Sequence, residues 1–204
     1  MMKKVYLVLI CLLLAAAVWF ATVISDRQQL NENVIRLHVV ANSDSGEDQR
    51  VKLLVRDEIN SQLATSMEEL STSGEALAYL REHLSQLEEA ANAVLAAEGF
   101  SQRAVVTLQK EAFSTRHYDT FSLPAGVYNA LRVTIGDGAG QNWWCVVFPR
   151  LCLPATSETF SDAAAGAGFQ QPLTGALQQE AGYEVRFFLL DWLGWLENFF
   201  FGNK

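Results

Sequence analysis

The 204-residue sequence predicts a single α+β domain behind an N-terminal apolar segment. An uncharged apolar run opens the chain, two stretches with a helical hydrophobic period follow, and the period then changes to that of strands. About 180 residues remain once the apolar run is set aside, which suits one domain with a real core and is cramped for two.

The charge balance excludes some classes of partner. The chain has 15 Lys and Arg residues against 23 Asp and Glu residues. Met1–Ser25 holds two lysines and no acid, so the rest has 13 basic and 23 acidic residues, a net charge of −10. Nucleic acid is therefore excluded as a partner, because its affinity depends on Lys and Arg that neutralise phosphates. Anionic lipid headgroups are poor partners for the same reason.

The N-terminal segment is long enough to cross a membrane. Two lysines precede Val5–Ile24, an uncharged run of about 20 residues that ends at Ser25. The basic flank predicts that the N-terminus stays in the cytoplasm and that residues 26–204 cross. Ala15–Ala17 also offers a cleavage site of the A-x-A type, so the segment is either a transmembrane anchor or a signal peptide. Both alternatives place the body outside the cytoplasm.

The body opens with a strand over Asn33–Asn42, whose residues VIRLHVVA are rich in β-branched side chains. The following Asn42-Ser43-Asp44-Ser45 breaks the strand and begins a helix, because Ser45 with Asp48, or Asp44 with Glu47, has the spacing of a capping box. The next apolar residues share one helical face, so the helix is amphipathic. They are Val51, Leu54, Val55, Ile59 and Leu63.

A second amphipathic helix follows the joint Ser71–Gly74. Its apolar residues recur at spacings of three and four, and Gly99 provides a helix stop. They are Leu77, Leu80, Leu84, Leu87, Ala91 and Val94. Three heptads are the lower limit for a coiled coil, so we interpret this helix as core-facing.

Beyond Gly99 the hydrophobic period changes to two, which predicts strands. Arg103–Lys110 alternates in this way, and so does Leu131–Ile135. The glycine-rich turn Gly136–Gly140 and the apolar run Asn142–Phe148 then complete the pattern of a hairpin. We therefore expect an antiparallel sheet.

The C-terminal region is less regular. Residues 155–182 are rich in Ala, Gly, Ser, Thr and Gln without a sustained period, so we expect a flexible loop or short helical turns. Tyr183–Phe188 resembles a further strand, and Leu189–Phe201 a short aromatic terminal helix. The predicted organisation is a signal peptide or anchor at residues 1–25 and one extracytoplasmic domain at residues 26–204.

Two of the three cysteines lie in the body, in the stretch NWWCVVFPRLC. In an oxidising compartment Cys145 and Cys152 are expected to form a disulfide. A catalytic thiol, a metal site and free buried thiols are the alternatives. A metal site would need further ligands, and none of the three histidines has a ligand spacing from these cysteines. We expect no metal and no cofactor.

One arrangement could support catalysis. His38 in the first strand can be combined with Asp44 or Asp48 as the dyad of an exported hydrolase. The competing interpretation makes both aspartates helix caps, which the helix dipole favours. The sequence has no GxSxG, HExxH, P-loop or paired D-[ST]-G element. The sequence therefore predicts a protein that is not an enzyme.

Aromatic residues offer a candidate surface. Trp143 and Trp144 are neighbours on one strand and must point to opposite faces. Together with Trp192, Trp195 and Phe199–Phe201 they either pack beneath the terminal helix or form an anchor for a partner or a bilayer.

Three sequence blocks resemble the stage II sporulation protein R family of endospore-forming bacteria. They are VIRLHVVANSDSGEDQRVKLLVRDE at 34–58, PAGVYNALRVTIGDGAGQNWWCVVFPRLC at 124–152 and YEVRFFLL at 183–190. The resemblance implies a protein made in the forespore and exported into the space between the forespore and mother-cell membranes. It also implies a partner, a membrane-embedded aspartic protease of the mother cell that processes a pro-sigma factor and supplies the catalytic aspartates.

Candidate contact residues for this partner lie in the first two blocks. They are Asn42, Ser43, Asp44, Glu47, Asp48, Gln49, Trp143 and Trp144. Two rival functions remain, the hydrolase based on His38 and a structural envelope protein held by residues 5–24. Deletion of a structural protein would leave sigma-factor processing unaffected.

Overall fold

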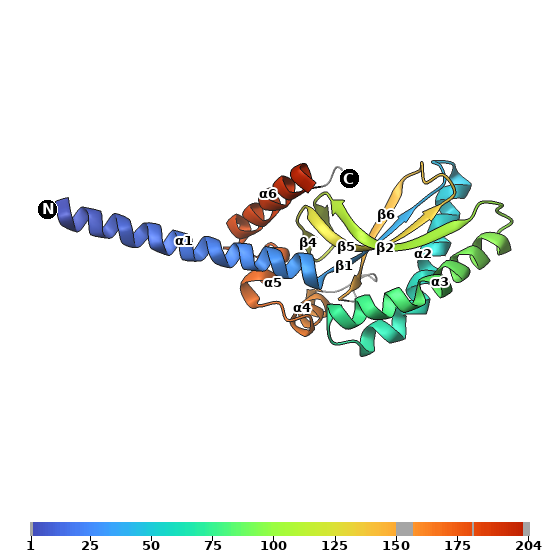
Figure 1. Cartoon of the computed structure of the whole chain (residues 1–204), viewed down its shortest axis with the longest axis horizontal. Helices are drawn as coiled ribbons and strands as arrows, with labels where there is room; N and C mark the ends of the chain where they lie inside the picture. The colour runs from blue at the N-terminus through green and yellow to red at the C-terminus, as the bar shows by residue number, and fades with distance from the viewer. Residues whose placement is uncertain (1, 150–156, 181, 202–204) are drawn as a thin grey trace.

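The structure of the chain is a computed structural model that describes residues 2–149, 157–180 and 182–201. Six helices and six strands are found in these ranges (Figure 1). They are α1 (Met2–Asn33), β1 (Ile35–Val40), α2 (Gly46–Glu69), α3 (Ser73–Ala97), β2 (Ala104–Phe113), β3 (Arg116–His117), β4 (Ser122–Leu123), β5 (Gly126–Ile135), β6 (Asn142–Phe148), α4 (Ser157–Gly166), α5 (Gln171–Leu177) and α6 (Glu184–Phe201).

The α+β class is confirmed, but the sheet is mixed rather than antiparallel. Its strand order is β2-β5-β1-β6, and β3 and β4 form a separate small pair. β1 runs parallel to β5 and antiparallel to β6, so Val39 lies between Val133 and Trp143. The predicted hairpin of Leu131–Ile135 with Asn142–Phe148 is therefore wrong. The apolar first strand is buried along its whole length because it is inserted between two strands that follow it by about 90 residues.

The first face of the sheet is covered by the two predicted amphipathic helices. α2 begins where expected, since the Ser45 side chain accepts a hydrogen bond from the Asp48 backbone at 3.1 Å. α3 begins with a complete capping box formed by Thr72 and Glu75. These helices share one apolar core with the alternate strand residues Leu37, Val39, Val106, Leu131, Val133, Cys145 and Val147.

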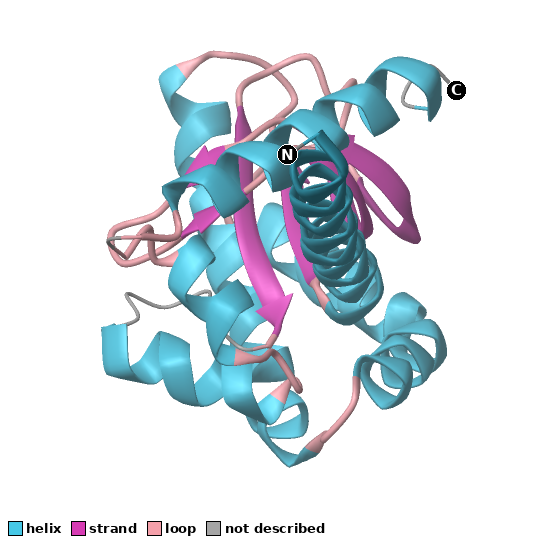
Figure 2. Ribbon diagram, turned by 90° about the vertical axis from the view of Figure 1, so that its left-hand side faces the viewer, coloured by secondary structure: helices cyan, strands magenta, loops and turns pink. Residues whose placement is uncertain are grey.

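The other face is covered by the end of α1 and by α4, α5 and α6, which surround a second core (Figure 2). The described part of 155–182, expected to be a flexible loop or short helical turns, contains two short helices. Tyr183–Phe188 is not a strand, because α6 begins at Glu184. The buried residues of α6 are Arg186, Leu190 and Gly194, which are four residues apart and lie on one helical face. The sequence did not indicate this helical period, because one of the three inward residues, Arg186, is charged.

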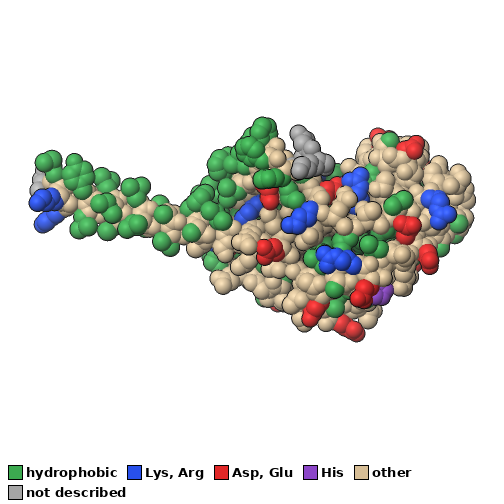
Figure 3. All heavy atoms as spheres, viewed as in Figure 1, with side chains coloured by type: hydrophobic (Ala, Val, Ile, Leu, Met, Phe, Trp, Pro, Cys, Tyr) green, Lys and Arg blue, Asp and Glu red, His purple; other side chains and the backbone are tan. Residues whose placement is uncertain are grey.

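α1 continues beyond the predicted end of the N-terminal segment. It is one helix from Met2 to Asn33, long and apolar enough to cross a membrane. Its apolar part extends away from the domain with exposed side chains (Figures 1 and 3). Its last turns are part of the domain, where Val23, Asp26, Arg27 and Leu30 are buried.

Candidate functional site

The first predicted contact block is built around the buried carboxylate of Asp48, at the N-terminus of α2. Its Oδ2 accepts hydrogen bonds from Ser43 Oγ at 2.5 Å and from Asn42 Nδ2 at 3.0 Å. These bonds, that of Ser43 foremost, lower the pKa of Asp48 below its ordinary 3.8. The same residues therefore stabilise the start of the helix with a charge that the helix dipole favours.

This block also holds the glycine-rich turn that joins β5 to β6. Asn42 Oδ1 accepts a hydrogen bond from the Asp137 backbone at 3.1 Å, and Asp44 Oδ1 accepts one from the Gln141 backbone at 2.7 Å. Gly136 has φ +55°, and a Cβ there would lie 2.3 Å from Asn42 Oδ1. Position 136 therefore favours glycine, because the positive φ is unfavourable for other residues and a side chain would collide with Asn42.

The inward side of α2 completes the arrangement. Gln49 donates to the Ser43 carbonyl at 2.8 Å, and Lys52 Nζ donates to Gln49 Oε1 at 2.6 Å and to the Gln141 carbonyl at 3.0 Å. Burial lowers the pKa of Lys52. Four of the predicted contact residues thus use their polar groups inside the fold, namely Asn42, Ser43, Asp48 and Gln49. Asp44 and Glu47 are exposed at the surface.

The two neighbouring tryptophans point to opposite faces, as predicted. Trp143 is 37% exposed on the α2 side, and the Arg56 guanidinium lies 4.3 Å from the centre of its ring. Trp144 is half-buried on the other face, where it stacks on His38 with 5.6 Å between ring centres. The Arg116 guanidinium covers Trp144 at 3.5 Å. Of this pair, Trp143 is the residue available to a partner.

The structure brings His38 to a glutamate that sequence reasoning missed. His38 Nδ1 and Glu111 Oε1 are 2.8 Å apart, and Arg132 Nη1 donates to the same oxygen at 2.8 Å. Burial would raise the pKa of Glu111, but the hydrogen bond and charge of His38 and the charge of Arg132 outweigh it, so that pKa is lowered. No sequence spacing signals a contact between residues 73 positions apart.

The hydrolase dyad of His38 with Asp44 or Asp48 is therefore wrong. Leu37 and Val39 face the core shared with α2, so the side chain of His38 points to the opposite face of the sheet. Asp48 is engaged by Ser43 and Asn42 at the start of α2.

Arg36 lies on the same face as His38 and is completely buried. Its guanidinium lies 4.0 Å from the centre of the Phe113 ring, and Nη2 donates to the Tyr118 hydroxyl at 3.2 Å. Nε and Nη1 have no hydrogen-bond partner among the described residues. Burial and the charge of Arg36 lower the pKa of the neighbouring Arg116. Arg36 and Arg116 are thus two neighbouring positive charges on this face.

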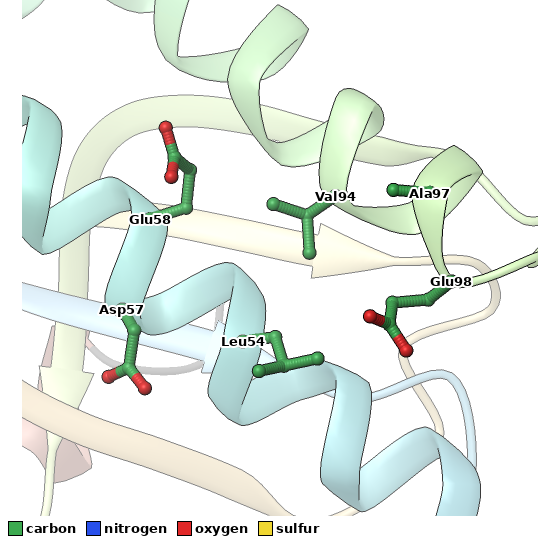
Figure 4. A pocket seen from close by; sticks show the side chains of 6 residues that line it. All are labelled: Leu54, Asp57, Glu58, Val94, Ala97 and Glu98. Carbon is green, nitrogen blue, oxygen red and sulfur yellow. The ribbon is translucent and has the colours of Figure 1, made fainter.

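A shallow groove lies between α2 and α3 (Figure 4). It is lined by Leu54, Asp57, Glu58, Val94, Ala97 and Glu98. The carboxylates do not converge, since Asp57 and Glu58 point to different sides and Glu98 is paired with Arg50 at 2.8 Å. Within the described ranges no group of three His, Cys, Asp or Glu residues could hold a metal ion.

Of the two cysteines in the predicted disulfide, the structure describes only Cys145. Cys145 is buried in β6 on the side of α2 and α3. Cys152 lies outside the described residues, so the pairing of these two cysteines stays a prediction.

Buried ion pairs join α1 to α6. Arg186 Nε donates to Asp26 Oδ2 at 2.6 Å, and both side chains are about nine-tenths buried. Arg27 donates from Nη1 to the Ala125 carbonyl at 2.6 Å and from Nη2 to Glu197 at 2.5 Å. The apolar helix is thus joined to the domain without a linker.

The two ends of the domain differ as a result. β1 starts directly after α1 and leads away from it, so the Asp48 block and the turn 136–141 lie at the end farthest from the apolar helix (Figure 1).

The chain was compared with known protein families, curated proteins and solved structures. The sequence model of the family described as stage II sporulation protein R matches residues 31–158. This range contains β1 to β6 with α2 and α3. The stage II sporulation protein R of Bacillus subtilis (strain 168) is 32% identical to the chain, over 79% of the chain and 80% of the relative. No solved structure matches. By the family match and this relative, the chain belongs to the stage II sporulation protein R family.

Proposed function

We propose that this protein is an exported signalling ligand that activates a membrane-embedded aspartic protease, which then processes a sporulation pro-sigma factor. The family supports a role in sporulation signalling. On this proposal residues 26–204 lie between the forespore and mother-cell membranes and the catalytic aspartates belong to the partner. A ligand of this kind acts by binding the active state of its partner more tightly than the inactive state.

The observation that carries the proposal is the position of the family's sequence block in the fold. The helix that could cross a membrane is joined rigidly to one end of the domain, and the Asp48 block lies at the other end. With α1 in one membrane, the domain presents this far end to the opposing membrane. Asp44, Glu47 and Trp143 are the members of the predicted contact set that are exposed there.

We infer that these three side chains form the contact surface. Asn42, Ser43, Asp48 and Gln49 act indirectly, because they hold the loop and the helix start in position. Asp44 does both, since it is exposed and also holds the turn through the Gln141 backbone. Trp143 has the character of an interface anchor, since it is a large aromatic side chain with an arginine against its ring.

Co-expression in a heterologous cell tests both statements. The full chain is directed to the envelope together with the protease and the sigma-factor precursor, and cleavage of the precursor is followed by immunoblot. We expect cleavage that depends on the chain and falls at least tenfold with Trp143→Ala. The matched control is Val105→Ala, an exposed apolar residue on the opposite edge strand, which should leave cleavage unchanged.

The outcomes separate the two statements. An uncleaved precursor in the presence of folded chain and protease refutes the function. If the precursor is fully cleaved with Trp143→Ala and also with Glu47→Lys, the proposed contact surface is refuted and the proposed function stands.

A further inference from the structure

Three of the four charged residues of α6 face the domain, and only Glu184 in the first turn is exposed, whereas large apolar side chains face outward. Arg186 pairs with Asp26, and Glu197 pairs with Arg27. Asp191 accepts a hydrogen bond from the Ala125 backbone at 2.7 Å. A surface helix in water has the reverse arrangement, with its polar side facing the solvent.

The outward face is a continuous apolar stripe. Its residues recur at spacings of three and four, and each is between 46% and 65% exposed. They are Val185, Phe188, Trp192, Trp195 and Phe199. Phe200 and Phe201 extend the apolar surface at the end of the helix. An exposed stripe of this size marks a surface that another apolar body covers.

The contacts of α6 set its direction relative to α1. Arg186 and Glu197 are 11 positions apart, which corresponds to about 16 Å along α6. Arg186 contacts Asp26, and Glu197 contacts Arg27 and Asn31, so these partners are only one to five positions apart along α1. α6 therefore crosses α1 instead of running alongside it. Figure 2, which looks along α1 from its N-terminus, shows α6 extending across the view toward the C-terminus.

The same contacts set the level of α6 along the apolar helix. Arg186 reaches Thr22 Oγ1 at 3.4 Å as well as Asp26. Thr22 and Asp26 lie at the end of the apolar run Val5–Ile24, where a transmembrane helix leaves the hydrocarbon. The first turns of α6 thus lie at the depth of the membrane–water boundary, where tryptophan is enriched. The later turns rise toward the domain, because Glu197 contacts Asn31. In Figure 3 the hydrophobic side chains over α6 adjoin those of α1.

We propose that α6 is an interfacial helix that inserts its outward face into the same bilayer that α1 spans. The occupant of the apolar stripe is the boundary between lipid headgroups and acyl chains, entered to a depth of about 5–10 Å. α1 and α6 together then hold the domain in one orientation, with the Asp48 block directed away from the membrane. The stripe contains no lysine or arginine, so attachment is apolar and does not require anionic lipid.

Tryptophan quenching by brominated lipid tests this proposal. The full chain with Trp19→Phe is placed, one copy per disc, in nanodiscs of phosphatidylcholine or of its acyl-brominated form. Bromine quenches only the indoles that touch the acyl region. We expect the emission to fall by about half, because Trp192 and Trp195 are two of the four remaining tryptophans.

Further variants assign the quenched signal. Adding Trp192→Phe and Trp195→Phe should abolish quenching, whereas adding Trp143→Phe should leave the quenched amplitude unchanged. The near-ultraviolet melting curve checks that each variant is folded. Equal emission in both kinds of nanodisc overturns the proposal and leaves a protein partner as the occupant. Quenching that is lost when each disc holds two copies also overturns it, in favour of a second copy of the chain.

Discussion

The contact between α6 and the bend that precedes β5 is so close that it admits only glycine. Gly194 is buried in the middle of α6, and a Cβ at this position would lie 1.6 Å from the Ala125 carbonyl oxygen. Cβ atoms essentially never approach a heavy atom within 3.0 Å, so Gly194→Ala must displace the helix by about 1.4 Å. We predict that this single methyl group partly detaches α6 from the domain.

The cost follows from what the displacement breaks. Forcing a methyl group into a closed contact costs about 1–3 kcal/mol. The hydrogen bonds of Ala125 with Arg27 and Asp191, now at 2.6 and 2.7 Å, would lengthen at a cost of about 1 kcal/mol each. Alanine recovers about 1 kcal/mol of helix propensity. The net loss in the free energy of unfolding is about 2–4 kcal/mol, equivalent to about 5–15 °C in melting temperature for a domain of this size.

The assay is near-ultraviolet circular dichroism of the full chain in phosphatidylcholine nanodiscs, because that signal reports tertiary packing and not the helix content of α1. The matched control is Gly74→Ala in α3, where the nearest atom to a new Cβ is Thr72 Oγ1 at 3.9 Å. The control should melt at the original temperature or slightly above it. If Gly194→Ala melts together with the control, the close contact of α6 with Ala125 does not exist.

Three further predictions concern the buried polar groups. The pKa of Asp48 is below 3.8 in the folded state, so its carboxylate stabilises the fold above that pH, and the stabilisation disappears as the pH falls through the folded-state pKa. Asp48→Asn should therefore melt at a lower temperature than the wild type at neutral pH, but its melting temperature should fall less steeply between about pH 6 and pH 3. A fall as steep as that of the exposed control Asp119→Asn would contradict this. Arg36→Met should leave the free energy of unfolding unchanged or raise it by about 1–3 kcal/mol in denaturant titration, because it removes two buried N–H groups that have no partner among the described residues. A clear loss of stability would show that other groups stabilise the charge of the Arg36 guanidinium. The denatured wild-type chain should show one titratable thiol and Cys145→Ser should show two, with a lower melting temperature; three thiols in the wild type would exclude a bridge to Cys152.

Local patterns predicted the elements whose causes are local. The start of α2 follows from Ser45 and Asp48, which are three positions apart, and it was found where expected. α3 begins inside the predicted joint Ser71–Gly74, with a capping box of Thr72 and Glu75 that was not predicted. The alternation in β2 and β5 was also correct, because a strand with one face on the core must alternate. The opposite directions of Trp143 and Trp144 follow from the same rule.

Errors arose where partners are distant along the chain. The hairpin between β5 and β6 fits every local signal, yet β1 lies between these strands and adds a parallel pairing. His38 was combined with aspartates near it in sequence, whereas its partner Glu111 comes from another strand. The strand predicted at Tyr183–Phe188 is helical, because Arg186 belongs to the inward face once it meets Asp26.

The sequence by itself determined the membrane-length apolar helix, the α+β class, the two amphipathic helices and the family, since each depends on composition or on neighbouring residues. The tertiary structure alone decided that the Asp48 block holds a turn, that α1 is joined rigidly to the domain, and that α6 turns its apolar side outward. These features depend on ion pairs and close contacts between residues about 100 to 170 positions apart, which no local period records.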